Sequence, residues 1–164
     1  MECRNALLEA QGDTKKAIQI LKQQSLLKVE KKRTRSASQG LIETYIHTGG
    51  RIGAMVEVNC ETDFAARTDE FKQLAHDLAM QVVAQDPRFI SEEQVPQEAD
   101  IESGSACLLL QPYIRDPEQT VQDIIDEIVA KVGENIKVTR FARFELGQAE
   151  STVAESEAGG AARE

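Results

Sequence analysis

The stretch RIGAMVEVNCETDFAAR, residues 51–67, contains the clearest strand of the chain and the turn that follows it. In its first nine residues an apolar side chain recurs at every second position, which predicts a strand with one buried face. The apolar positions of that face are Ile52, Ala54, Val56 and Val58. The run GLIETYIH, 40–47, precedes this strand, and the connecting segment His47-Thr48-Gly49-Gly50 is typical of a tight turn. The sequence therefore predicts an antiparallel hairpin at the centre of the fold.

Two helices and a third strand are predicted to complete the region after this hairpin. Residues 68–85 repeat apolar positions at helical spacing, with Thr68 as the N-cap. A second helix is expected to start at Asp116, with Pro117 in its first turn, and to end at Gly133. A final strand is predicted over 136–146. Its inward positions would be Ile136, Val138, Ala142, Phe144 and Leu146, with Arg140 interrupting the pattern.

The remaining segments flank this core, which is expected over 40–147. Residues 1–24 have the apolar spacing of two short helices, separated by Gly12 and capped at Asp13. Residues 25–39 are predicted to be a basic linker, and residues 148–164 a disordered acidic tail. The fold class is therefore α+β, with a small antiparallel sheet of about three strands covered by helices on one face and preceded by the helical hairpin.

Composition narrows the class of protein. The chain has 164 residues and a formal net charge of −9. Residues 1–40 carry +5 and residues 41–147 carry −11, and this acidic main body argues against binding to nucleic acid. The three cysteines are far apart and indicate neither a disulfide framework nor a zinc site. No segment is long and apolar enough to predict a membrane span or a signal peptide.

The residue patterns indicate no catalytic site. A phosphate-binding loop, a zinc-protease motif and a nucleophile with an adjacent base are all absent from the sequence. His47 could serve as a general base, but a single histidine in a hairpin turn is more often structural. Phe64 is unusual because it lies where a chain ordinarily turns with small or polar residues. A large apolar residue after a strand more often packs in the core. A loop held by a rigid scaffold, however, is where recognition residues tend to lie.

Several segments together resemble translation elongation factor Ts. They are YIHTGG, RIGAMVEVNCETDFAAR, LLLQPYIRD and KVGENIKVTRFARFELG, and the N-terminal MECRNALLEAQGDTKKAIQILK is similar to the last two helices of that family's ubiquitin-associated-like domain. The resemblance covers residues 1–147. Relative to the family pattern, a first helix before Met1 and some tens of helical residues between Glu98 and Leu108 are expected to be missing.

The resemblance implies a function without catalysis. Family members promote release of GDP from the GTPase elongation factor Tu and require no cofactor. It implies that Thr62, Asp63, Phe64 and Ala65 form the segment that docks on the GTPase and dislocates its magnesium ion. Valine is usual at position 65, so alanine there would trim an apolar contact. His47, Gly49 and Gly50 are implied to lie beside this segment as a secondary part of the same contact patch.

Alternative functions stay open at this point. The chain could be an inactive or truncated remnant of the family, a ubiquitin-associated-like binding module, or an RNA-associated protein that uses Lys31 to Arg35. Elongation factor Tu is the expected partner. Direct nucleotide binding and membrane association are not expected, and self-association is possible. The expected location is the bacterial cytoplasm, or an organellar stroma or matrix if the source is eukaryotic.

Overall fold

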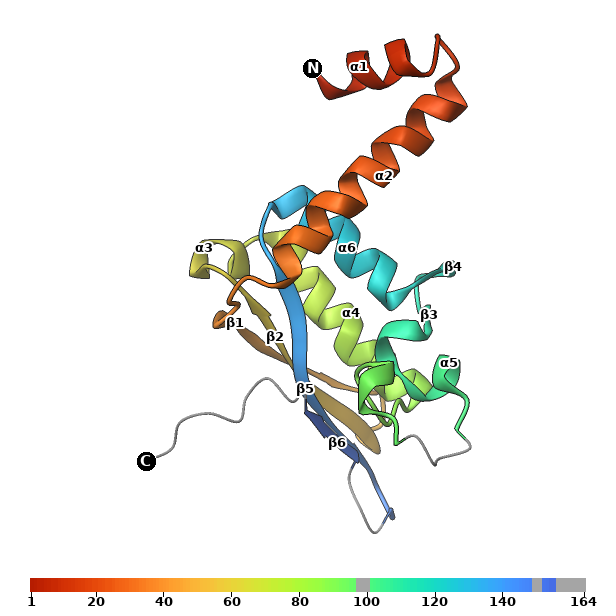
Figure 1. Ribbon diagram of the computed structural model, residues 1–164. Helices are drawn as coiled ribbons and strands as arrows, with labels where there is room; N and C mark the ends of the chain where they lie inside the picture. The colour runs from red at the N-terminus through yellow and green to blue at the C-terminus, as the bar shows by residue number, and fades with distance from the viewer. Residues whose placement is uncertain (97–100, 149–151, 156–164) are drawn as a thin grey trace.

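The protein is an α+β domain with a helical arm at its N-terminus. The computed structural model describes residues 1–96, 101–148 and 152–155 (Figure 1). An antiparallel sheet with strand order β1-β2-β5-β6 is packed on one face against helices α4 and α6, while α1 and α2 extend away from the sheet. The predicted fold class is confirmed.

The central hairpin forms as the sequence predicts. Strand β1, Gln39–Ile46, pairs with β2, Ile52–Cys60, so that Gln39 is opposite Cys60 and Ile46 opposite Gly53. In the connecting turn the Gly50 N–H donates to the carbonyl of His47 at 2.9 Å, and both glycines have positive φ angles, which glycine adopts without strain. Alternate residues of β2 from Ala54 to Cys60 are buried against the helices.

Strand β5, Ile136–Glu145, lies beside β2 and contains a bulge that the sequence analysis did not predict. Val58 is opposite Val138, but Glu57 is opposite Arg140, so Thr139 is an extra residue. Beyond it the alternation is reversed. Phe141 and Arg143 are buried, whereas Phe144 and Leu146 are exposed, so the inward positions predicted for Ala142, Phe144 and Leu146 were wrong.

Helix α4, Asp69–Gln85, covers the inner face of the sheet. Thr68 caps it by accepting a hydrogen bond from the Phe71 N–H, as predicted. The apolar stripe of the helix is buried and forms the centre of one core with β2, β5 and helix α6. Its members are Phe71, Leu74, Ala75, Leu78, Ala79, Val82 and Val83.

Helix α6, Val121–Val132, begins later than the sequence indicated. The segment Asp116–Thr120 is strand β4, which pairs with β3, Pro112–Tyr113. Thr120 is the true N-cap, and its hydroxyl and backbone N–H form a capping box with Asp123. The two backbone donors satisfied in this box, the N–H groups of Thr120 and Asp123, outweigh the helix-start signal of Asp116-Pro117. The end at Gly133, which has a φ of 87°, was predicted correctly.

The second of the two N-terminal helices is longer than expected. Helix α1, Glu2–Glu9, and helix α2, Thr14–Arg33, form the predicted hairpin, and Asp13 caps α2. However, α2 continues through most of the segment 25–39, which the sequence analysis treated as a linker. No proline or glycine interrupts it there, and Val29 is buried in the domain core.

Basic residues at the end of α2 also have partners within the protein. Arg33 forms an ion pair with Asp126 of α6 at 2.8 Å, and the Lys32 ammonium donates to the Val129 carbonyl at 3.4 Å. Lys28 pairs with Glu2 of α1. Leu7 and Ile18 are exposed, whereas Leu21 packs in part against the small alanine cluster of the hairpin.

Short elements fill the connection between α4 and α6. They are η1, Glu92–Gln94, α5, Ser103–Ala106, and η2, Leu108–Leu110. An isolated bridge also joins Phe89 and Cys107 in this connection. The tail predicted to be disordered lies mostly outside the described residues, but Thr152–Glu155 form β6, which pairs with β5 and adds a fourth strand to the sheet.

Candidate partner-binding site

The predicted recognition segment forms a single short helix after β2. Helix α3, Asp63–Ala66, begins three residues beyond the end of the strand. The Thr62 hydroxyl accepts a hydrogen bond from the Ala65 N–H at 3.3 Å and so caps its start. At its end the Thr68 hydroxyl donates to the Ala65 carbonyl at 2.8 Å. Because both ends of α3 are capped by threonine side chains, the backbone around Phe64 is held on both sides.

Phe64 points away from the domain. Its exposed fraction is 77%, the largest among the bulky apolar residues of the described chain except Met1. The two residues that follow it, Ala65 and Ala66, are buried in the core, with Ala65 only 4% exposed. The small alanines allow α3 to pack against β1 and β2. Their burial on one side of this helical turn leaves the phenylalanine ring on the other.

Asp63 has a partner on its own turn. Its carboxylate accepts a hydrogen bond from the Arg67 guanidinium at 2.8 Å, and both side chains are substantially exposed. An exposed pair of this kind contributes little to stability. The charge of Asp63 is therefore partly neutralised beside Phe64, while both groups are available to a partner protein.

Cys60, the last residue of β2, is buried and contacts the same turn. Its thiol donates to the Thr62 carbonyl at 3.1 Å. Burial, and to a smaller extent the nearby Glu134 carboxylate, raises the pKa of the Cys60 thiol. The thiol therefore stays protonated, and its role is structural.

This environment predicts a difference in thiol reactivity. At pH 8 we expect iodoacetamide to alkylate the exposed Cys3 at least about tenfold faster than Cys60, because only the thiolate reacts and it must be accessible. Peptide mass spectrometry over a time course would measure both rates. The buried Cys107, whose pKa is also raised by burial, serves as the matched comparison. Equal rates for Cys3 and Cys60 in the native protein would contradict the structure, whereas denaturant should make them similar.

Residues 47–50 are not adjacent to this segment. The turn containing His47, Gly49 and Gly50 precedes β2, whereas α3 follows it, so the length of the strand separates them. Nine residues of strand span roughly 25 to 30 Å. The two segments therefore do not lie side by side, and the part of His47, Gly49 and Gly50 in a partner contact stays a prediction. His47 instead lies close to Tyr45, with 3.3 Å between the tyrosine hydroxyl and Nδ1.

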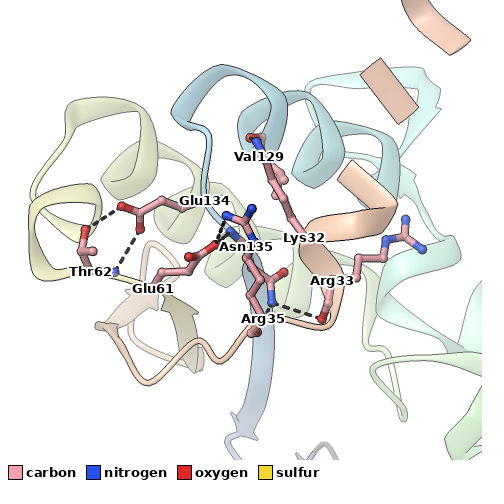
Figure 2. Close-up of polar contacts among 8 residues, drawn as sticks. All are labelled: Lys32, Arg33, Arg35, Glu61, Thr62, Val129, Glu134 and Asn135. Carbon is pink, nitrogen blue, oxygen red and sulfur yellow. Dashed lines mark hydrogen bonds and ion pairs between the residues drawn. The ribbon is translucent and has the colours of Figure 1, made fainter. Parts of the chain in front are cut away.

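Glu134 contributes to the site and was not assigned a role from the sequence. It follows the Gly133 cap of α6 and accepts hydrogen bonds from the Thr62 hydroxyl at 2.7 Å and from the Thr62 N–H at 3.0 Å (Figure 2). It belongs to the KVGENIKVTR block that carries the family resemblance, but that block indicates no contact with a residue 72 positions earlier.

The described residues contain neither a candidate membrane-spanning helix nor a candidate metal site. No helix among them combines the length and apolar character needed to cross a bilayer. Within the same part of the chain, no group of three or more histidine, cysteine, aspartate or glutamate side chains is arranged to hold a metal ion.

Comparison with known proteins gives consistent matches. The sequence model of the family described as "Elongation factor TS" matches residues 9–103. Elongation factor Ts of Caldanaerobacter subterraneus subsp. tengcongensis is 47% identical over 178 aligned positions, which cover 90% of this chain and 89% of that protein. Elongation factor Ts of Thermoanaerobacter sp. (strain X514) and of Carboxydothermus hydrogenoformans are each 46% identical over 90% of this chain and over 87% and 82% of their own lengths.

The alignment also bears on the length of the chain. Ninety per cent of 164 residues is about 148, so about 30 of the 178 aligned positions have no counterpart here. This agrees with the internal shortening that the sequence predicts. The family match over residues 9–103 and the identity of 47% over 90% of the chain agree, and the chain belongs to the elongation factor Ts family of translation elongation factors.

Proposed function

We propose that this protein is a guanine-nucleotide exchange factor that binds elongation factor Tu in its GDP form and promotes release of GDP. The observation that carries the proposal is the exposed ring of Phe64 on a helix that is capped at both ends. Family membership supports it, because the TDF segment is where the resemblance implies docking on the GTPase.

An exchange factor needs binding energy and no chemistry of its own. If it binds the nucleotide-free GTPase more tightly than the GDP complex, then it weakens GDP binding by the same factor. Phe64 is suited to this role because a large exposed aromatic can enter a pocket that opens when the magnesium-binding segment of the partner shifts. The protein is therefore proposed not to be an enzyme and not to bind the nucleotide itself.

The four residues of the segment have different parts in this proposal. Phe64 makes the apolar contact with the partner. The Asp63 carboxylate can bind a group of the partner in place of Arg67. Thr62 and Ala65 support the segment from within the domain. Thr62 caps the helix, and Ala65 packs in the core. His47, Gly49 and Gly50 remain a proposed second contact, which requires a partner surface that extends along the sheet.

Release of a fluorescent GDP analogue from elongation factor Tu tests the proposal. With excess unlabelled GDP as the chase, we expect the purified chain to increase the release rate in proportion to its concentration. Binding to the partner without acceleration would instead favour a protein-binding module. Neither binding nor acceleration would indicate an inactive member of the family. The relatives are bacterial proteins, so we place the reaction in the bacterial cytoplasm.

A further inference from the structure

Two turns at one end of the sheet exchange hydrogen bonds through their carboxylates. Cys60 and Ile136 are the last opposed residues of β2 and β5, and beyond them the chain enters the turn 61–62 and leaves the turn 134–135. The Glu134 carboxylate accepts the Thr62 N–H at 3.0 Å, and the Glu61 carboxylate accepts the Asn135 N–H at 2.7 Å (Figure 2). Side chains thus continue the pairing of the two strands where the backbone ladder stops. We call residues 61–62 and 134–135 the turn pair.

Within the turn pair, Glu134 determines how Thr62 caps α3. A hydroxyl group has one proton to donate and lone pairs with which to accept. The Thr62 hydroxyl donates that proton to Glu134 at 2.7 Å, so its lone pairs face the Ala65 N–H. The bond to a charged carboxylate is stronger than one between neutral groups. Removing Glu134 would leave the hydroxyl free to rotate and the Thr62 N–H without its acceptor.

The end of α2 also contacts the turn pair. The Asn135 side chain is buried, and its amide donates to the carbonyls of Arg33 at 3.2 Å and Arg35 at 2.7 Å, at the end of α2. The Arg35 guanidinium lies 3.5 Å from the Glu61 carboxylate. The position of Glu134 therefore depends on α2, α6 and β5 together, and Glu134 transmits that position to the helix that carries Phe64 (Figure 2).

We propose that Glu134 is a positioning residue for nucleotide exchange, which orients Phe64 by fixing the Thr62 cap of α3. The proposal rests on the proposed function for its effect on GDP release, but the ordering of the turn can be measured without a partner. Glu134 acts through Thr62 and does not itself need to touch the GTPase.

Amide hydrogen exchange of the isolated protein tests the ordering of the turn. In the Glu134→Ala variant we expect the amides of Ala65 and Ala66 to exchange about tenfold faster, because both donate to Thr62 atoms whose position is no longer fixed. Amides of β2 and α4 should keep their protection. Glu127→Ala, which removes an exposed carboxylate from α6, is the matched control. Unchanged exchange at Ala65 and Ala66 would overturn the proposal.

A double-mutant cycle in the GDP release assay tests whether the effect passes through Phe64. We expect Glu134→Ala to lower the stimulated release rate about tenfold, the effect of an unsatisfied hydrogen-bonding group. In the Phe64→Ala background the same substitution should have almost no further effect, because residues that act as a unit are not additive. Independent, additive losses would show that Glu134 does not act through Phe64 and would overturn the proposal.

Glu134→Gln separates positioning from a general loss of structure. Its amide oxygen can accept from the Thr62 hydroxyl, but its NH2 group cannot accept from the Thr62 N–H, so we expect an activity between wild type and Glu134→Ala. If Glu134→Ala fails to fold, the glutamine variant carries both tests. If the wild-type chain does not accelerate GDP release, the proposed function fails and with it the role in exchange, while hydrogen exchange still decides whether Glu134 orders the turn.

Discussion

Replacement of Phe64 by alanine is expected to reduce the acceleration of GDP release from elongation factor Tu about 30-fold. That factor corresponds to about 2 kcal/mol, the effect of an ordinary interface hot spot. The reason is that the ring is largely exposed and packs little within its own domain, so its apolar surface is available for a partner pocket. Stopped-flow fluorescence with a labelled GDP analogue would measure the change.

Phe144 provides the matched control for this substitution. It is also a phenylalanine with most of its surface exposed, 59%, but it lies on the outer face of the sheet in β5 and not on α3. Phe144→Ala should therefore leave the release rate near wild type. Phe64→Ala should keep the free energy of unfolding within about 0.5 kcal/mol, as for other exposed positions. Equal rates for wild type and Phe64→Ala would eliminate the proposed role of the ring.

Replacement of Gly40 by alanine is expected to destabilise the folded protein by about 4 kcal/mol, a large part of the 5 to 15 kcal/mol typical of a domain. A Cβ atom built at Gly40 would lie 2.1 Å from the Val58 carbonyl oxygen and 2.8 Å from the Asn59 Cα, both of them backbone atoms. The φ angle of 147° is in addition one that residues with a side chain rarely adopt. Strand β1 would have to separate from β2 to relieve the contact.

Chemical denaturation followed by circular dichroism would measure this change in the free energy of unfolding. Gly104→Ala is the control, because a Cβ there meets no atom within 4 Å and the backbone has no positive φ. We expect the control to change stability by less than about 0.5 kcal/mol. A Gly40→Ala variant as stable as Gly104→Ala would show that the two strands do not approach each other as the structure has them.

The elements that the sequence predicted correctly are those with a regular pattern and local signals. The alternation in β2, the seven-residue stripe of α4 and the Thr68 cap each depend on residues that are close in the chain. The end of α2 was missed because a longer-range contact decided it. Helix α2 extends to Arg33 because Val29 packs in the domain core, and no local pattern reports that contact.

The candidate site was predictable only in part, and for a similar reason. The residue pattern marked Phe64 as unusual, but core packing was its commoner role, and the family resemblance was needed to favour recognition. Neither could indicate Glu134, because its contact with Thr62 joins two turns that meet only when β2 and β5 have paired. Ala65 was assigned to the partner surface, yet the structure buries it in the core.

The bulge at Thr139 holds one extra residue of β5, so the effect of a change in chain length depends on where in the strand it falls. Deleting Thr139 would restore an unbroken ladder with β2 and leave the later side chains on their present faces, because Phe141 is already opposite the buried Val56. Deleting a residue after the bulge, such as Ala142, would instead move Arg143 to an outward position and Phe144 to an inward one. We therefore expect β5 to tolerate a deletion at the bulge better than a deletion elsewhere in the strand.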